Sequence, residues 1–220
     1  MDWQALGVTL RLAAATTSIL FIIGIPWAWW LATTRWRGRF LLEALAALPM
    51  VLPPTVLGFY LLLALSPNSP LGRWLIFITG QQLPFTFMGI LIGSVIGNLP
   101  FAVRPFTAAF AGVDRRLLEA SWCLGVSRLD TFRRIALPLA WPGVVTGLVL
   151  TFAHVLGEFG IVLMIGGNIP GVTRTLSVSI YDHVQAMEYA AASQTALFLL
   201  ITSFVVLCLV QWLTPRGWST

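Results

Sequence analysis

Long apolar stretches separated by short polar segments make up most of this chain. Five stretches that carry no acidic residue and no Arg are long enough to cross a bilayer, at residues 12–31, 44–65, 83–103, 135–157 and 189–213. About 20 helical residues, at about 1.5 Å each, cover a hydrocarbon core roughly 30 Å thick. The pattern therefore predicts an all-α integral membrane protein with five transmembrane helices, forming a single domain over residues 1–220.

Composition and charge support this prediction and orient the chain. Hydrophobic residues make up 58% of the sequence and charged residues 10%, well below the roughly 25% of a soluble domain. The basic residues are all Arg, and nine follow the first, third or fifth stretch: Arg35, Arg37, Arg39, Arg115, Arg116, Arg128, Arg133, Arg134 and Arg216. The positive-inside rule then places the amino terminus outside and the carboxyl terminus in the cytoplasm. We attribute the net charge of +5 to this topology, because nucleic-acid binding would need a contiguous basic patch on a soluble face.

The second apolar stretch contains three prolines that should break its helix. Pro49, Pro53 and Pro54 lie within LPMVLPPTVLG. Each Pro lacks an N–H and clashes with the preceding turn. Such a break is stable at membrane depth only against protein or a water-filled path. We therefore expect Pro53 and Pro54 to lie at a pathway or gate.

The third stretch combines small residues with interruptions. Gly89, Gly93 and Gly97 recur every four residues, which predicts a face where another helix approaches closely. Asn98, Pro100 and the pair Arg104-Pro105 follow and are expected to interrupt the helix. A helix bundle that forms a pathway would contain such interruptions, and Arg104 is a candidate to contact an anion in it.

Two ionisable residues, His154 and Glu158, lie near the outer end of the fourth stretch. At a spacing of four they are predicted to share a helix face, and ionisable residues within a membrane are functional candidates. The alternative is that Glu158 reaches the interface while His154 bonds a neighbouring helix. The loop that follows carries Asn168, Thr173 and Arg174, whose donors suit an anion near the entrance, although an ordinary outer loop looks similar.

A polar insert, residues 112–137, separates the third and fourth stretches. Asp114 can cap a first helix, Gly125 can end it in the left-handed conformation, and Ser127 with Asp130 can start a second. The expected product is a helix-turn-helix on the cytoplasmic surface. Its Arg content also permits a helix pair lying on anionic lipid.

The spacing within this insert resembles the EAA loop of the permeases of binding-protein-dependent ABC importers. The matching positions are Glu119, Ala120, Ser121, Gly125, Ile135, Leu137 and Pro138, with Ser121 where Ala is usual. The resemblance implies the type I importer permease fold, in which this loop forms coupling helices that sit in a cleft of the ATP-binding subunit.

Three further strings narrow the resemblance to the molybdate branch of that family and its sulfate and tungstate relatives. They are LPMVLPPTVLGFYLL in the second stretch, LGEFG at residues 156–160 and NIPGVTRT at residues 168–175. The resemblance implies a permease that moves molybdate across a bacterial or archaeal inner membrane by alternating access. It also implies a homodimer embedded in lipid, two cytoplasmic ATPase subunits and a periplasmic or lipoprotein molybdate-binding protein. The alternatives are sulfate or tungstate transport, a membrane scaffold that does not transport, and an independent secondary transporter.

The sequence offers no candidate for nucleotide or metal chemistry. It contains no Lys, so it lacks the Gly-rich phosphate loop whose Lys holds nucleotide phosphates. No His, Cys, Asp or Glu residues show the spacing of metal ligands, and no catalytic triad can be argued. We therefore expect no enzyme and no cofactor in this chain, with ATP bound by a partner subunit.

Overall fold

The computed structural model describes residues 2–213, and every regular element within them is a helix. Four continuous helices are long and apolar enough to cross a membrane: α1 (Trp3–Thr33), α5 (Phe87–Ala111), the helix Arg128–Leu156 and α11 (Tyr189–Leu213). A bent pair, α2 (Arg39–Val51) and α3 (Pro54–Leu65), supplies a fifth span if it is taken as one. The described residues therefore hold four such spans, or five if the bent pair is one, and helices overlap each of the five predicted stretches.

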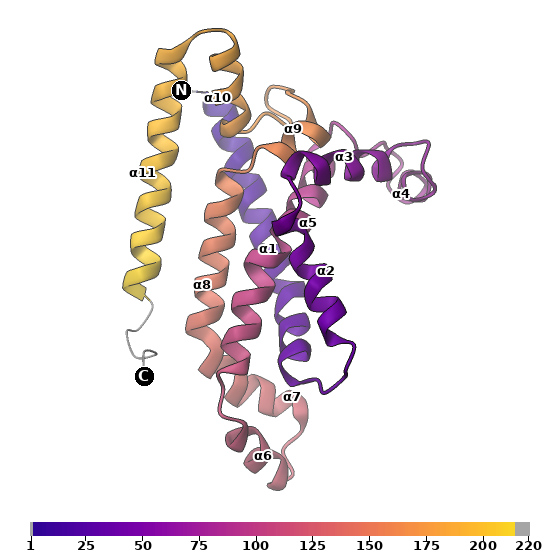
Figure 1. The fold of residues 1–220 in the computed structure, drawn as a ribbon, viewed down its shortest axis with the longest axis vertical. Coiled ribbons are helices and arrows are strands. Elements are labelled where there is room, and N and C mark those ends of the chain that lie inside the picture. The colour runs from indigo at the N-terminus through magenta and orange to yellow at the C-terminus, as the bar shows by residue number, and fades with distance from the viewer. Residues whose placement is uncertain (1, 214–220) are drawn as a thin grey trace.

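The core of the bundle lies between α1, α5 and α8 (Leu137–Leu156), which run side by side in Figure 1. Phe106 of α5 is fully buried at their meeting point. Gly24 of α1 and Gly147 of α8 lie against opposite edges of its ring, where a Cβ would come within 3.2 Å and 2.7 Å of ring carbons. The two glycines therefore allow three helices to close around one aromatic side chain.

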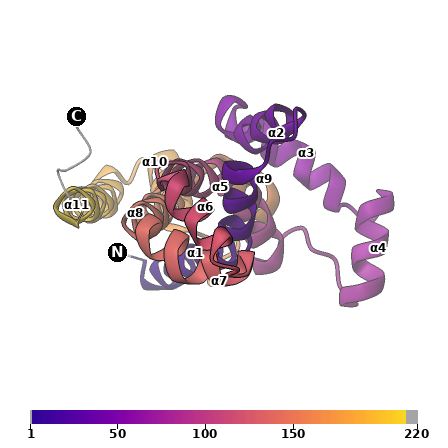
Figure 2. The ribbon, with the colours of Figure 1, turned by 90° about the horizontal axis from the view of Figure 1, so that it is seen from below.

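The bend between α2 and α3 measures 110° and lies at Leu52–Pro53. Pro53 precedes α3 and Pro54 is its first residue, so the predicted break is present. Residues 44–65 are therefore divided between two helices, and α3 turns across the bundle. Figure 2 shows α3 and α4 (Pro70–Thr79) projecting from one edge of the molecule, with α11 at the opposite edge.

The third span differs from its prediction at both ends. Its helix begins at Phe87 rather than residue 83, because the Thr86 hydroxyl caps it by accepting from Gly89 N. The predicted interruptions at Pro100 and Pro105 are wrong, since α5 continues through both to Ala111. Burial of this half of α5 between α1 and α8 offsets the hydrogen bonds that the two prolines remove.

The polar insert contains α6 (Arg115–Cys123), α7 (Arg128–Thr131) and a π-helical turn, η1 (Phe132–Ala136). From Arg128 the helix runs without interruption into α8, so the fourth span does not begin afresh at residue 135. Leu137 N–H bonds to Phe132 O, five residues back. This wider turn accommodates Pro138, which has no N–H to donate.

Three elements complete the chain after α8: α9 (Gly160–Gly166), α10 (Leu176–Gln185) and α11. Figure 1 shows the amino-terminal end of α1 at the end of the bundle where α10 lies. The helices α6 and α7 lie at the other end, toward which α11 runs. The two ends of the described chain therefore point to opposite ends of the bundle.

Candidate functional site

The fourth span breaks beside the middle of α5. Helix α8 ends at Leu156, and Gly157 caps it. Glu158, the next residue, reaches Asn98, which is close to the midpoint of the 25-residue α5. Helix α9 then starts at Gly160. Interrupted helices at the bilayer midplane are typical of transporter substrate sites, because irregular backbone at this depth must face protein or water.

A series of hydrogen-bonded polar side chains lies at this break. Ser94 Oγ donates to Glu158 Oε2, and Asn98 Nδ2 donates to the same oxygen over 3.0 Å. Asn98 Oδ1 lies 2.8 Å from His154 Nδ1. Glu158, Ser94 and Asn98 are buried, whereas His154 is exposed. This series of hydrogen bonds therefore links the buried carboxyl group of Glu158 to the imidazole of His154 on the surface of the subunit.

The prediction that His154 and Glu158 share a helix face is wrong, because α8 ends between them. They are connected through Asn98 instead. Of the alternative, the half in which His154 bonds a neighbouring helix is observed, whereas Glu158 is buried within the bundle. Sequence reasoning placed Asn98 among the helix interruptions and missed Ser94, although their spacing of four within an apolar helix puts both on one face.

The ring of His154 is also held by an aromatic contact. It stacks on Phe101 of α5 with a centroid separation of 3.8 Å and an interplanar angle of 24°. Arg104 follows one turn later on α5 and is exposed, with Nη1 3.7 Å from Met50 Sδ near the end of α2. Arg104 thus lies near the bent second span, whereas Pro53 and Pro54 lie at the bend itself.

Helix α9 fills the space between α3 and α5. Gly160 packs on Pro54, and Gly58 of α3 faces the backbone of α9. On the other side, Gly93 of α5 faces Ile161 and Ile165 of α9. The predicted close approach at the glycine face of α5 is therefore confirmed. Two strings that are far apart in the sequence, around Pro54 and around Gly160, meet directly here.

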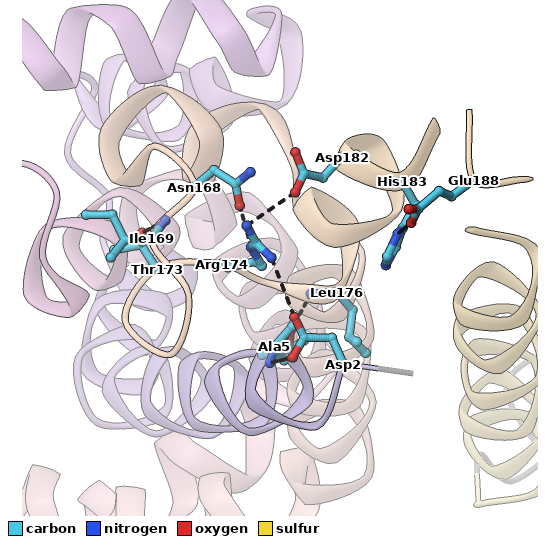
Figure 3. Close-up of polar contacts among 11 residues, drawn as sticks. Asp2, Ala5, Asn168, Ile169, Thr173, Arg174, Leu176, Asp182, His183 and Glu188 are labelled. Atoms are coloured by element: carbon cyan, nitrogen blue, oxygen red, sulfur yellow. Dashed lines mark hydrogen bonds and ion pairs between the residues drawn. The ribbon is translucent and has the colours of Figure 1, made fainter. Parts of the chain in front are cut away.

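The outer loop between α9 and α10 is tied to both of them (Figure 3). Thr173 is fully buried, and its hydroxyl donates to Gly166 O over 2.7 Å while accepting from Ile169 N over 3.2 Å. Leu176 N donates to the Thr9 hydroxyl of α1 over 2.9 Å. The loop is therefore fixed to the end of the bundle where α1 begins.

Arg174 joins this loop to α10 and to the start of α1, as the dashed lines of Figure 3 show. Its Nε donates to Asn168 Oδ1 over 2.6 Å. Its Nη2 pairs with Asp182 of α10 at 3.2 Å, and Nη1 lies 3.9 Å from Asp2, the cap of α1. The guanidinium is thus engaged by acceptors of its own chain, and Asn168 is one of them.

The helix-turn-helix at the opposite end has the predicted caps. Asp114 caps α6 by accepting from Arg116 N, and Ser127 caps α7 by accepting from Asp130 N. Gly125 has a φ of +78°, and its N–H bonds to Trp122 O while Val126 N–H bonds to Ser121 O. This pair of bonds is a Schellman motif, which ends α6 sharply.

The coupling-loop residues divide into a buried and an exposed set. The Ser121 hydroxyl lies 2.8 Å from that of Thr131, a buried contact that joins α6 to α7. Ile135 lies in η1, while Leu137 and Pro138 form the first turn of α8. Glu119 and Ala120 are exposed, and Leu124 is 83% exposed at the turn. A rigid, partly apolar projection of this kind suits contact with a soluble protein.

The sequence matches the family described as "Binding-protein-dependent transport system inner membrane component" over residues 24–218. The chain belongs to this family. The permease is 50% identical to the molybdenum transport system permease protein ModB of Azotobacter vinelandii, over 94% of this chain and 91% of that one. It is 32% identical to ModB of Escherichia coli K12, over 96% and 93% of the two chains.

Solved structures agree on the fold of the permease. A bacterial ABC transporter that imports alginate superposes with a TM-score of 0.78 at 18% identity, covering 98% of this chain and 79% of that one. The MetNI methionine ABC transporter gives a TM-score of 0.73 at 19% identity, covering 98% and 97%. The permease therefore has the type I ABC importer fold. It is a transmembrane subunit of an ABC importer and a multi-pass inner-membrane protein, not an enzyme.

Proposed function

We propose that the permease moves molybdate across the inner membrane by alternating access. The observation that carries this proposal is the 50% identity to a molybdenum transport permease over nearly the full length of both chains. The strings around Pro54 and Gly160 lie together in space, and the third string ties the outer loop to them through Gly166. These strings therefore form one structural unit around the break at Glu158.

The importer is proposed to contain two copies of this permease, two cytoplasmic ATPase subunits and a periplasmic or lipoprotein molybdate-binding protein. One structural relative was solved "in complex with alginate pentasaccharide-bound periplasmic protein", which supports a binding protein as a partner. ATP is bound by the ATPase subunits, and this chain needs no cofactor of its own. The Arg asymmetry places the amino terminus outside and the carboxyl terminus inside.

Coupling to ATP hydrolysis is assigned to the loop at residues 112–137. The segment from Glu119 to Gly125, exposed except at Ser121, forms the surface that enters the ATPase cleft. The buried Ser121–Thr131 contact and the continuous helix from Arg128 to Leu156 make the loop rigid. A rotation of the ATPase subunits would therefore be passed through α8 to the break at Glu158.

The pathway is assigned to the face near the two broken helices. Its candidate residues are Pro53, Pro54, Arg104, His154 and Glu158, with Asn168, Thr173 and Arg174 at its outer entrance. Several weak contacts suit transport better than one tight site, because a tight site would retain the ion.

Sulfate is the second candidate substrate, and tungstate is chemically close to both. A relative named "Probable sulfate transport system permease protein cysT" of Nephroselmis olivacea is 32% identical over 96% of this chain but 74% of its own. Molybdate is preferred because the identity to the Azotobacter relative is higher and covers both chains.

Purification together with the ATPase subunits, followed by variants of the coupling loop, tests the assembly. Replacement of Glu119 by Ala should leave membrane insertion intact but reduce ATPase activity stimulated by the loaded binding protein. If Glu119→Ala and unmodified complexes couple hydrolysis to uptake equally well in vesicles, the coupling assignment is wrong. If no ATPase subunit is recovered with the permease, the assembly itself is wrong.

A further inference from the structure

His154 is an exposed, ionisable side chain beside the middle of a membrane-spanning helix. It stacks on Phe101 and bonds Asn98, both in the central part of α5. A polar side chain that faces lipid at this depth is costly, so such residues face a bundle interior or a water-filled cavity. The face that carries His154 is therefore not a lipid face.

The hydrogen bonds around Asn98 determine which nitrogen of His154 is free. Asn98 Nδ2 lies 2.8 Å from Ser94 O and 3.0 Å from Glu158 Oε2, both of which are acceptors. The amide nitrogen must therefore point toward them, which leaves Asn98 Oδ1 to face His154. An amide oxygen only accepts, so His154 Nδ1 carries the proton of that bond. Nε2 is the nitrogen left for another molecule.

Glu158 lies at the buried end of this arrangement. Its carboxyl group is buried, with Oε2 accepting from Ser94 and Asn98, while Oε1 has no hydrogen-bond partner among residues 2–213. A buried carboxylate is stable only beside compensating charge. His154 lies on the other side of the Asn98 amide. Its imidazolium form carries an N–H on Nε2 as well as on Nδ1, and an anion beside Nε2 favours that form.

We infer that His154 is an oxyanion contact in the transport pathway and that Asn98 and Glu158 are positioning residues that hold its ring. The inference rests on the proposed function and adds a substrate contact to it. Molybdate, a tetrahedral oxyanion, accepts from the Nε2–H, while Asn98 and Phe101 fix the direction of that bond. This hydrogen bond is one of the several weak contacts of the proposed pathway, and it lies at the subunit surface.

The test uses the complete importer in vesicles, with radiolabelled molybdate, saturating loaded binding protein and ATP. His154→Phe removes the donor but keeps a flat ring, and we expect uptake per ATP hydrolysed to fall about tenfold, the effect of losing one hydrogen bond to a charged group. His154→Arg keeps a cationic donor and should retain most of the uptake. The control is His183→Phe, since His183 lies on α10 and pairs with Glu188.

The outcomes separate the inference from the proposed function. Absence of molybdate uptake by the unmodified importer would overturn the proposed function. Normal uptake by His154→Phe, or equal loss in His154→Phe and His154→Arg, would overturn the inference. Asn98→Leu should reduce uptake alone but cause no further loss in the His154→Phe background, because Asn98 acts through His154. Additive losses would contradict this positioning role.

A second measurement does not depend on transport rate. The variant is His154→Cys in a chain whose native Cys123 and Cys208 are replaced by Ser. Its thiol should react with a charged, membrane-impermeant reagent when the pathway is open to the side of the membrane on which the reagent is added. We expect the reaction to slow when ATP closes the importer. A thiol that never reacts in either state would place His154 against lipid or protein and would overturn the inference.

Discussion

Gly58 of α3 lies so close to Gly160 of α9 that a Cβ on Gly58 would be 3.3 Å from the carbonyl oxygen of Gly160. The same Cβ would be 2.8 Å from Met164 Cβ. The two glycines therefore join the segments that follow the two breaks in the bundle, at Pro53 and at Glu158. Because the segments are in contact, movement of one broken span must displace the other.

Gly160→Val should disrupt this contact. A Cβ at Gly160 would lie 2.8 Å from Pro54 Cβ, so the backbones of α9 and of the start of α3 would have to move apart. We expect a loss of about 1–3 kcal/mol in stability, seen as a lower Tm of the purified protein, together with reduced uptake. Gly7→Ala in α1 is the control, because nothing lies within 4 Å of its added Cβ. Equal Tm values for the two variants would show that α3 and α9 do not depend on this contact.

Gly125→Ala tests the turn of the coupling loop. Gly125 has a φ of +78° and Gly80, at the end of α4, has a φ of +72°, and both have open space around them. Ala at either site should cost about 1–2 kcal/mol through backbone strain alone. We expect only Gly125→Ala to lower the ratio of uptake to ATP hydrolysis, measured in vesicles. A similar loss of coupling in Gly80→Ala would indicate a general effect of destabilisation.

Exchange of the charges of Arg174 and Asp182 distinguishes a clamp from an anion contact. Their side chains pair at 3.2 Å. Arg174→Asp alone should loosen the outer loop and increase its cleavage by a protease added to the outside. The double variant Arg174→Asp, Asp182→Arg should restore most of the protection and the uptake. If protection returns but uptake does not, Arg174 contacts the anion as well as Asp182.

Glu158→Gln and Glu158→Leu should differ in stability. Gln has the same shape and keeps an oxygen that can accept from Ser94 and Asn98. Leu removes the acceptor of the Ser94 hydroxyl and one of the two acceptors of Asn98 Nδ2, which keeps its bond to Ser94 O. A buried donor left without an acceptor costs about 1–3 kcal/mol. The Tm of purified Glu158→Leu should therefore lie well below that of Glu158→Gln. Similar values would mean that the hydrogen bonds to Glu158 contribute little to the bundle.

The features that could be predicted from the sequence are those set by local chemistry. Hydropathy located the spans, and the caps at Asp114, Gly125 and Ser127 follow from residue type and spacing. Pro53-Pro54 identified the break in the second span, because a missing N–H acts within the same turn. None of these signals depends on what packs against the segment.

The features that could not be predicted depend on packing between segments. Pro100 and Pro105 do not stop α5, since α1 and α8 bury the helix around Phe106. The link from Glu158 to His154 runs through Asn98, about 60 residues earlier in the chain. Arg174 was predicted to offer donors to an anion, but Asp182 of α10 pairs with it at 3.2 Å, and Asp2 at the start of α1 lies 3.9 Å away. Spacing along the chain carries no information about such contacts.

Molybdate transport by this permease, in an importer driven by ATP, can be measured directly. The most direct measurement is uptake of radiolabelled molybdate by vesicles that contain the permease and its ATPase subunits, with the loaded binding protein added outside. We predict uptake that requires both ATP and the binding protein and that excess unlabelled molybdate suppresses more strongly than sulfate does. Uptake without ATP, or stronger suppression by sulfate than by molybdate, would show that the permease is not an ATP-driven molybdate transporter.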